Sequence, residues 1–174
     1  MALFGLIFVM ANVGTLPSTL GTAFAVLAVA AFVVVLLTVL RPDRESEPGT
    51  PGGTAFGRGY WLELAAEVAA GAVGLVVLNG PLDAPDAGVA WIAFVVGVHF
   101  FGLAVVWRQS FFRWLGAAIT ACGALGLILA AAGSSAAGIA AVGGVLPGFV
   151  LLVSGLLGPR PGAADGDLGP ALSR

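Results

Sequence analysis

Lysine is absent from this chain of 174 residues, which also has only one histidine and one cysteine. The seven basic residues are therefore all arginines, and charged residues make up 9% of the chain, whereas roughly a quarter of an ordinary soluble domain is charged. So few basic residues form no basic face, which argues against nucleic-acid binding. One cysteine excludes an intrachain disulfide and cysteine-based metal sites, and one histidine argues against a metalloenzyme, so we expect no metal and no cofactor.

Sequence features of enzymes are equally scarce. The short loops leave no room for a soluble catalytic domain, and the Gly-Lys-Ser loop of a nucleotide-driven motor is missing. A serine nucleophile needs a side chain nearby that acts as a general base. No such residue lies at helical spacing from Ser134, Ser135 or Ser154, which argues against an intramembrane serine hydrolase. Cys122 lies within an apolar run and is predicted to be a packing residue. We therefore expect a protein without enzymatic activity.

The chain is instead rich in apolar residues: 59% of its residues are hydrophobic, and the mean hydropathy is +1.07. A water-facing shell could not hide so much apolar surface at this chain length, so lipid must cover it. Long runs of Ala, Leu and Gly favour helices over barrel strands. The sequence predicts an all-α integral membrane protein, a bundle of about five helices at 18–40, 60–79, 88–107, 112–132 and 137–157. The fifth helix contains Pro147 and is expected to be kinked.

The ends and the first linker differ from this bundle, which covers residues 18–157. Residues 1–17 are apolar but too short to span comfortably, so we expect a short interfacial or half-inserted helix, with a sixth, tilted span as the alternative. Residues 41–59 and 158–174 are rich in Gly, Pro and charge and have no apolar face to bury. Both are predicted to be flexible and exposed to solvent.

The arginines predict how the chain is threaded through the plasma membrane. They occur only in the first linker, in the loop after the third span and in the tail: Arg41, Arg44, Arg58, Arg108, Arg113, Arg160 and Arg174. The alternate loops, 79–88 and 132–138, carry none. Because cytoplasmic loops are enriched in basic residues, we expect a multi-pass protein with a cytoplasmic C-terminus and, with five spans, an external N-terminus.

Two carboxylates, Glu63 and Glu67, stand near the start of the second span. They lie about 40° apart around a helix, and Gly71 and Gly74 continue the same face. Small residues at such spacing let another helix approach closely, so this face is predicted to point into the bundle rather than toward lipid. Gly144 and Gly148 have the spacing of a motif for helix dimerisation. In a chain with 27 glycines this spacing is common by chance, so it is weak evidence for a dimer.

His99 is expected to lie at the depth of Glu67. Glu67 is roughly 10 Å and His99 about 12 Å from the same side of the membrane, and spans joined by a short loop are usually neighbours. The sequence therefore predicts that Glu67 and His99 contact each other as a hydrogen-bonded or ionic pair. At the boundary, Arg58, Arg108 and Gln109 are candidate partners of Glu63. Tyr60, Trp91, Trp107 and Trp114 are predicted to be anchors at the membrane interface.

These features leave three functions open. The first is a non-enzymatic accessory or scaffolding protein within the lipid bilayer, as a homo-oligomer or part of a larger membrane complex, in which the polar pair holds helices together. The second is a proton-coupled carrier or channel for small solutes or ions that uses Glu67 and His99. An enzyme acting on lipid ranks third, because a second catalytic group is missing.

Overall fold

The computed structural model describes residues 1–40 and 58–157, except for the side chain of Arg58. In these ranges the chain is helical and contains no strand. The elements are α1 (Ala2–Asn12), η1 (Val13–Thr15), α2 (Ser18–Val39), α3 (Arg58–Asn79), η2 (Pro85–Ala87), α4 (Gly88–Val106), α5 (Ser110–Ala131), α6 (Ala136–Ala140), η3 (Ala141–Val145) and α7 (Leu146–Leu157).

The five predicted spans are confirmed as helices. Five helical segments are long and apolar enough to cross a membrane, namely α2, α3, α4 with η2, α5, and the continuous segment Ala136–Leu157. Each observed end lies within about two or three residues of the predicted one, as expected for boundaries read from hydropathy. The expectations for Arg41, Arg44, Arg160 and Arg174 lie outside the described residues.

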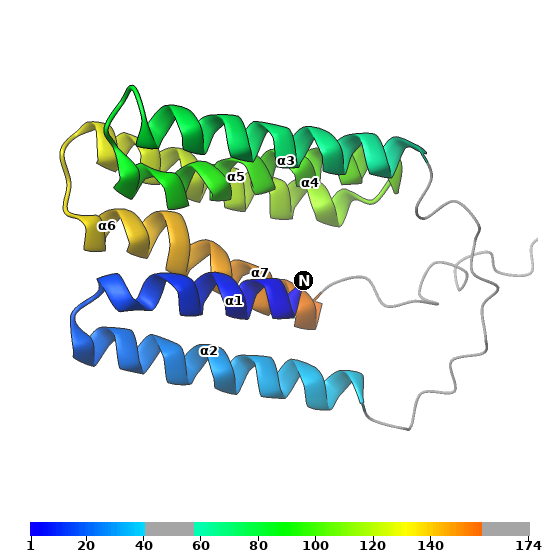
Figure 1. The fold of residues 1–174 in the computed structure, drawn as a ribbon. Helices are drawn as coiled ribbons and strands as arrows, with labels where there is room; N and C mark the ends of the chain where they lie inside the picture. The colour runs from blue at the N-terminus through cyan, green and yellow to red at the C-terminus, as the bar shows by residue number, and fades with distance from the viewer. Residues whose placement is uncertain (41–57, 158–174) are drawn as a thin grey trace, which may run out of the picture.

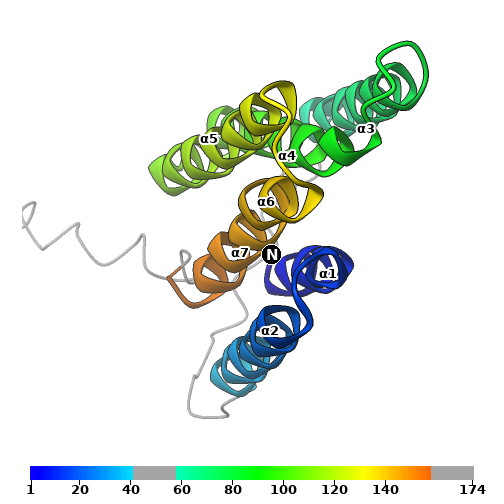
Figure 2. The ribbon, with the colours of Figure 1, turned by 90° about the vertical axis from the view of Figure 1, so that its left-hand side faces the viewer.

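The helices form two groups that meet at α6 and α7. Figure 2, a view along the bundle, shows α3, α4 and α5 on one side and α1 and α2 on the other, with α6 and α7 between them. One apolar core joins α4, α5 and α7 and includes Phe100, Ile119 and Leu151. A second core joins α1, α2 and α7 around Val9 and Leu152. Helices α2 and α3 therefore lie at opposite edges of the bundle.

Glycines allow the inner helices to approach closely. Gly97 and Gly123 of α4 and α5 lie directly against the backbones of Thr120 and Phe94, so no larger residue would fit at either glycine. Ala90, which is fully buried, packs where α4, α5 and η3 meet. Since lipid is as apolar as a leucine side chain, such close packing supplies much of the attraction between membrane helices.

The N-terminal segment forms a short helix that packs along the bundle, and whether it is interfacial, half-inserted or a sixth, tilted span stays a prediction. Helix α1 runs antiparallel to α2 and packs against α7 (Figure 1). Gly5 meets the backbone at Gly148, and Val9 is completely buried. The Ser154 hydroxyl lies 3.7 Å from the Met1 sulfur, so the N-terminus is at the same end as the C-terminal end of α7.

This placement bears on two related expectations. Five spans predict that the N-terminus and the end of α7 lie on opposite sides of the membrane, whereas in the bundle Met1 lies beside Ser154. Gly144 and Gly148 contact Asn12 and Val9 of α1, so this glycine pair packs a helix of the same chain, in agreement with its weakness as a dimer motif. Hydropathy could not show this, because lipid and a helical neighbour both select apolar residues.

Pro147 is accommodated by a change of helical register. The segment Ala141–Val145, immediately before α7, is π-helical. Proline has no N–H to donate to the preceding turn, and a wider π turn is a common way to absorb such a missing bond. The irregular turn brings Gly143 and Gly144 against Ala90 and Asn12 on either side.

Candidate functional site: the seam between α3 and α4

Helices α3 and α4 are antiparallel, and their contact line carries the ionisable residues that the sequence indicated. Going along α3, Glu63 meets Gly102, Glu67 meets His99, and Gly74 meets Trp91. These partners recur at intervals of roughly one or two helical turns, as required for two antiparallel helices in constant register. We call this contact line the α3–α4 seam. The face containing Glu63, Glu67, Gly71 and Gly74 points toward α4, as its small residues indicated.

Glu67 and His99 form the central pair of the seam. The Glu67 Oε2 and His99 Nδ1 atoms are 3.3 Å apart, and the side chains are 20% and 10% exposed. The distance permits an ion pair when His99 is protonated, but the two groups are not aligned for a hydrogen bond, and His99 Nδ1 has no hydrogen-bond partner. The seam therefore contains a nearly buried polar atom whose bonding capacity is unused.

Glu63 lies one turn nearer the linker. Its carboxylate sits directly over Gly102, where any larger residue would collide with it. Two of its candidate partners, Arg108 and Gln109, are exposed in the turn after α4, and among the described side chains Arg108 makes no ion pair with Glu63. Arg108 has a φ of 53°, the left-handed conformation that often ends a helix. The Arg58 side chain lies outside the description.

Trp91 is part of the seam, a role that the sequence analysis missed. Its indole Nε1 donates a hydrogen bond to the Ala70 carbonyl oxygen at 3.2 Å, and its ring covers Gly74. The same ring stacks on Phe94, with centroids 5.9 Å apart. Trp91 precedes His99 by eight residues, about 80° around the helix, and this spacing could have indicated a shared face. Tyr60 and Trp107 also stack on one another across α3 and α4.

A groove of about 240 Å³ follows one side of the seam. Its walls are Glu63, Ala66, Glu67, Ala70, Trp91, Phe94, Val95, Val98 and His99. Helix α3 lies at the edge of the bundle and packs mainly on α4, so the groove is lined by these two helices alone. Three ionisable side chains thus share a small space that is otherwise lined by apolar and aromatic groups.

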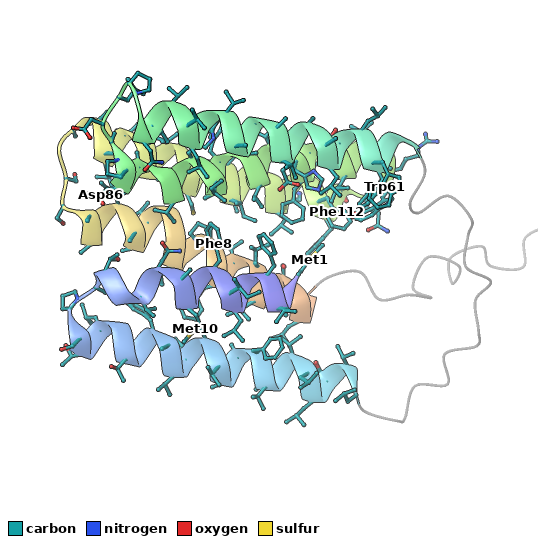
Figure 3. All side chains as sticks on the ribbon, viewed as in Figure 1. Met1, Phe8, Met10, Trp61, Asp86 and Phe112 are labelled. Carbon is teal, nitrogen blue, oxygen red and sulfur yellow. The ribbon has the colours of Figure 1, made fainter. Side chains whose placement is uncertain are left out.

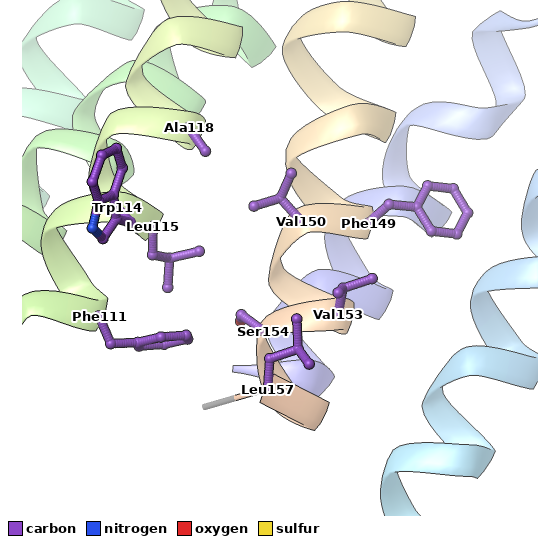
Figure 4. Close-up of a pocket in the computed structure, with 9 residues that line it drawn as sticks. All are labelled: Phe111, Trp114, Leu115, Ala118, Phe149, Val150, Val153, Ser154 and Leu157. Atoms are coloured by element: carbon purple, nitrogen blue, oxygen red, sulfur yellow. The ribbon is translucent and has the colours of Figure 1, made fainter. Parts of the chain in front are cut away.

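Other polar groups of the bundle are used locally. Asn12 donates to the Phe8 carbonyl, and Ser154 donates to the Leu151 carbonyl. Figure 4 shows a second groove, between α5 and α7, whose labelled lining is apolar except for Ser154. Within residues 1–40 and 58–157, no three His, Cys, Asp or Glu side chains are grouped in a way that could hold a metal ion. The seam is therefore the candidate functional site.

Comparison with known proteins finds no matching family, no similar curated protein and no similar solved structure. The chemistry of the seam and the faces of the edge helices are thus the basis for a function.

Proposed function

We propose that this protein is a non-enzymatic accessory or scaffolding subunit that binds another membrane helix on the outward face of α3. The observation that carries the proposal is the composition of that face. Ala65, Ala69 and Ala72 are exposed there, opposite the seam, beside larger exposed residues that include Leu62 and Val76. Interfaces between membrane helices are enriched in small residues because these let two backbones approach closely.

The other edge helix is the comparison within the same chain. Exposed residues of α2 include Val26, Val33 and Leu37, which are 64%, 44% and 58% exposed, and such larger side chains suit contact with lipid tails. The buried share of the membrane-spanning window is 6% in α3 and 11% in α2, against 44% in α4, so both edge helices leave most of their surface free. What distinguishes α3 is its three exposed alanines at the helical spacing of positions 65, 69 and 72.

In this proposal the polar seam has a structural role. Helix α3 packs mainly on α4, and the Glu67 to His99 pair and the Trp91 hydrogen bond to Ala70 tie the two helices together. Hydrogen bonds between membrane helices contribute about 0.6 to 2 kcal/mol each. The seam would thus hold α3 in place while its opposite face binds the partner.

Photocrosslinking in native membranes tests this proposal. A benzoylphenylalanine at Ala69 should crosslink to protein, and the same group at Leu37 should react only with lipid. A product of twice the 17.3 kDa chain mass would identify a homo-oligomer, and any other mass a different subunit. Crosslinking to lipid alone at both positions would contradict the proposal.

We also propose that the bundle lies in the plasma membrane with the Trp107 to Gln109 turn and the C-terminus in the cytoplasm. The support is the distribution of arginine: Arg108 and Arg113 lie at one end of the bundle, and Asp83 and Asp86 at the other. Figure 3 labels Trp61 and Asp86 at these opposite ends. Basic residues favour the cytoplasmic side of a membrane.

A proton-coupled carrier is a second candidate, favoured by the 3.3 Å approach of Glu67 and His99 inside a groove. Carboxylates and imidazoles within membrane spans often belong to proton relays. In reconstituted vesicles, a carrier would move protons when a solute is added. A Glu67→Gln, His99→Gln double variant that remains folded should then lose this movement, because neither amide exchanges a proton near neutral pH. Absence of solute-dependent proton movement in the wild type, over a panel of small solutes, would reject this candidate.

A further inference from the structure

We propose that the groove beside the seam binds the ammonium group of a small primary amine that also carries an apolar body. The groove combines two carboxylates, from Glu63 and Glu67, with an unused imidazole nitrogen and two aromatic rings. This site is separate from the partner face, since Ala65 and Ala69 lie on the other side of α3. Amine binding and partner binding can therefore fail independently.

Charge selects a cation. Among the described side chains, the two carboxylates face at most one positive charge, on His99, and no arginine is among the lining residues. An ionised carboxylate in an apolar setting is costly unless it is paired. A bound ammonium would supply the missing counter-charge to Glu63 or Glu67, whereas an anion would add to the imbalance.

Hydrogen bonding selects an ammonium with N–H groups. Nδ1 of His99 is buried and makes no hydrogen bond to Glu67 Oε2 across 3.3 Å, so it does not satisfy the Glu67 carboxylate as a hydrogen-bond donor. A primary ammonium has three donors, so one group can donate to the Glu63 and Glu67 carboxylates together. A quaternary ammonium has no N–H and would leave both carboxylates without a donor. The site should therefore distinguish these two kinds of cation.

The remaining lining selects an apolar body of limited size. Trp91 and Phe94 stack on each other at one wall, and Ala66, Ala70 and Val98 complete the apolar surface. The 240 Å³ volume is below the roughly 300 to 1,000 Å³ of pockets for drug-sized ligands. A single ring on a short chain suits this space, and the ring faces would also attract the cation.

Binding of 2-phenylethylammonium to the full chain in phosphatidylcholine nanodiscs, measured by equilibrium dialysis, tests the proposal. The amine should bind saturably. 2-Phenylethanol, of similar size but neutral, and benzyltrimethylammonium, charged but without donors, should each bind at least about tenfold more weakly, because the alcohol lacks the positive charge and the quaternary cation lacks the N–H donors. Equal binding of the alcohol, or of the quaternary cation, would overturn the proposal.

Variants locate the site. Glu67→Gln should weaken binding roughly ten- to hundredfold through loss of a charged hydrogen bond. Ala66→Phe should block the groove without touching a polar group, which keeps the test valid if Glu67→Gln fails to fold. Ala118→Phe, in the groove between α5 and α7, and Asp86→Asn, at the far end of the bundle, are matched controls that should bind as the wild type does. Unchanged binding in Ala66→Phe and in folded Glu67→Gln would overturn the proposal.

The ammonium can come from a free amine or from the headgroup of phosphatidylethanolamine. Nanodiscs that contain this lipid distinguish the two sources. If the lipid competes with 2-phenylethylammonium, the headgroup is a ligand of the groove; if binding is unchanged, the site takes free amines. Saturable binding of the amine, sensitive to Ala66→Phe, supports the proposal in either case.

Discussion

At the residue scale, the pairing of Glu67 with His99 lowers the free-energy cost of placing two polar side chains in an apolar bundle. A charged residue at the centre of a membrane helix costs about 2.5 to 3.5 kcal/mol on insertion scales. A partner within 3.3 Å, with both side chains at most 20% exposed, offsets part of this cost. Removing either partner should leave the other with neither water nor a counter-charge.

A double-mutant cycle on Glu67→Gln and His99→Gln tests this pairing. Each single change should destabilise the protein, and the double change should cost less than the sum, with a coupling of about 0.5 to 3 kcal/mol. Thermal unfolding in detergent is the measurement. The pair Thr22→Val and Glu67→Gln is a control for additivity, since Thr22 bonds only within α2. Additive effects of Glu67 and His99 would show that the two side chains are energetically independent.

At the scale of elements, glycine contacts determine which helices pack together. Gly148 on α7 faces Gly5 and Val9 of α1, and Gly155 faces Ala2. These glycines place a helix too short for an independent span against the centre of the bundle. The burial of Val9 follows from this close approach and not from the hydropathy of the segment.

Replacing Gly148 with leucine should displace α1. The leucine side chain would enter the space of Val9 and the Gly5 carbonyl, and overpacking of this kind typically costs about 1 to 3 kcal/mol. Hydrogen exchange of the α1 amides should accelerate, whereas Val153→Leu, on the exposed side of α7, should leave them protected. Unchanged protection in the Gly148 variant would be incompatible with the packing of α1 on α7.

At the scale of the whole molecule, the position of α1 determines the side of the membrane on which the chain begins. Met1 lies beside Ser154, near the end of α7. The turn at Trp107 to Gln109 lies at this same end, and Asp86 at the opposite end (Figures 1 and 3). The two termini of the described bundle should therefore face the same compartment.

Labelling of introduced cysteines in intact cells checks this arrangement. In a Cys122→Ala background, Ala2→Cys and Gln109→Cys should react with a membrane-impermeant maleimide only after permeabilisation. Asp86→Cys should react from outside, because the end that carries arginine is proposed to face the cytoplasm. If positions 2 and 109 are labelled from opposite sides, the N-terminus is external and the five-span arrangement holds. If all three positions are labelled from the side opposite to the one expected, the bundle has the reverse orientation in the membrane.

The candidate site could be predicted in part. Helical periodicity put Glu63 and Glu67 on one face, and the antiparallel rise placed His99 level with Glu67, so their proximity followed from residue counting. Trp91 was missed because a tryptophan near a helix end is usually an interface anchor. Its hydrogen bond to Ala70 depends on how α3 and α4 approach each other at Gly74. Likewise, Arg108 is near Glu63 in height along the helices, but its side chain is exposed and makes no ion pair with Glu63 among the described residues.

The sequence by itself determined the helical membrane class and the five long helices, because backbone hydrogen bonding within lipid requires helices and hydropathy marks their length. The packing of α1 on α7, the contacts of Gly144 and Gly148 with α1, and the Trp91 contact with α3 could be seen only in the tertiary structure. Lipid and protein interior are equally apolar, so composition shows that a face avoids water but not what covers it. The close approach of particular backbones, at Gly5, Gly97 and Gly148, shows which faces another helix covers.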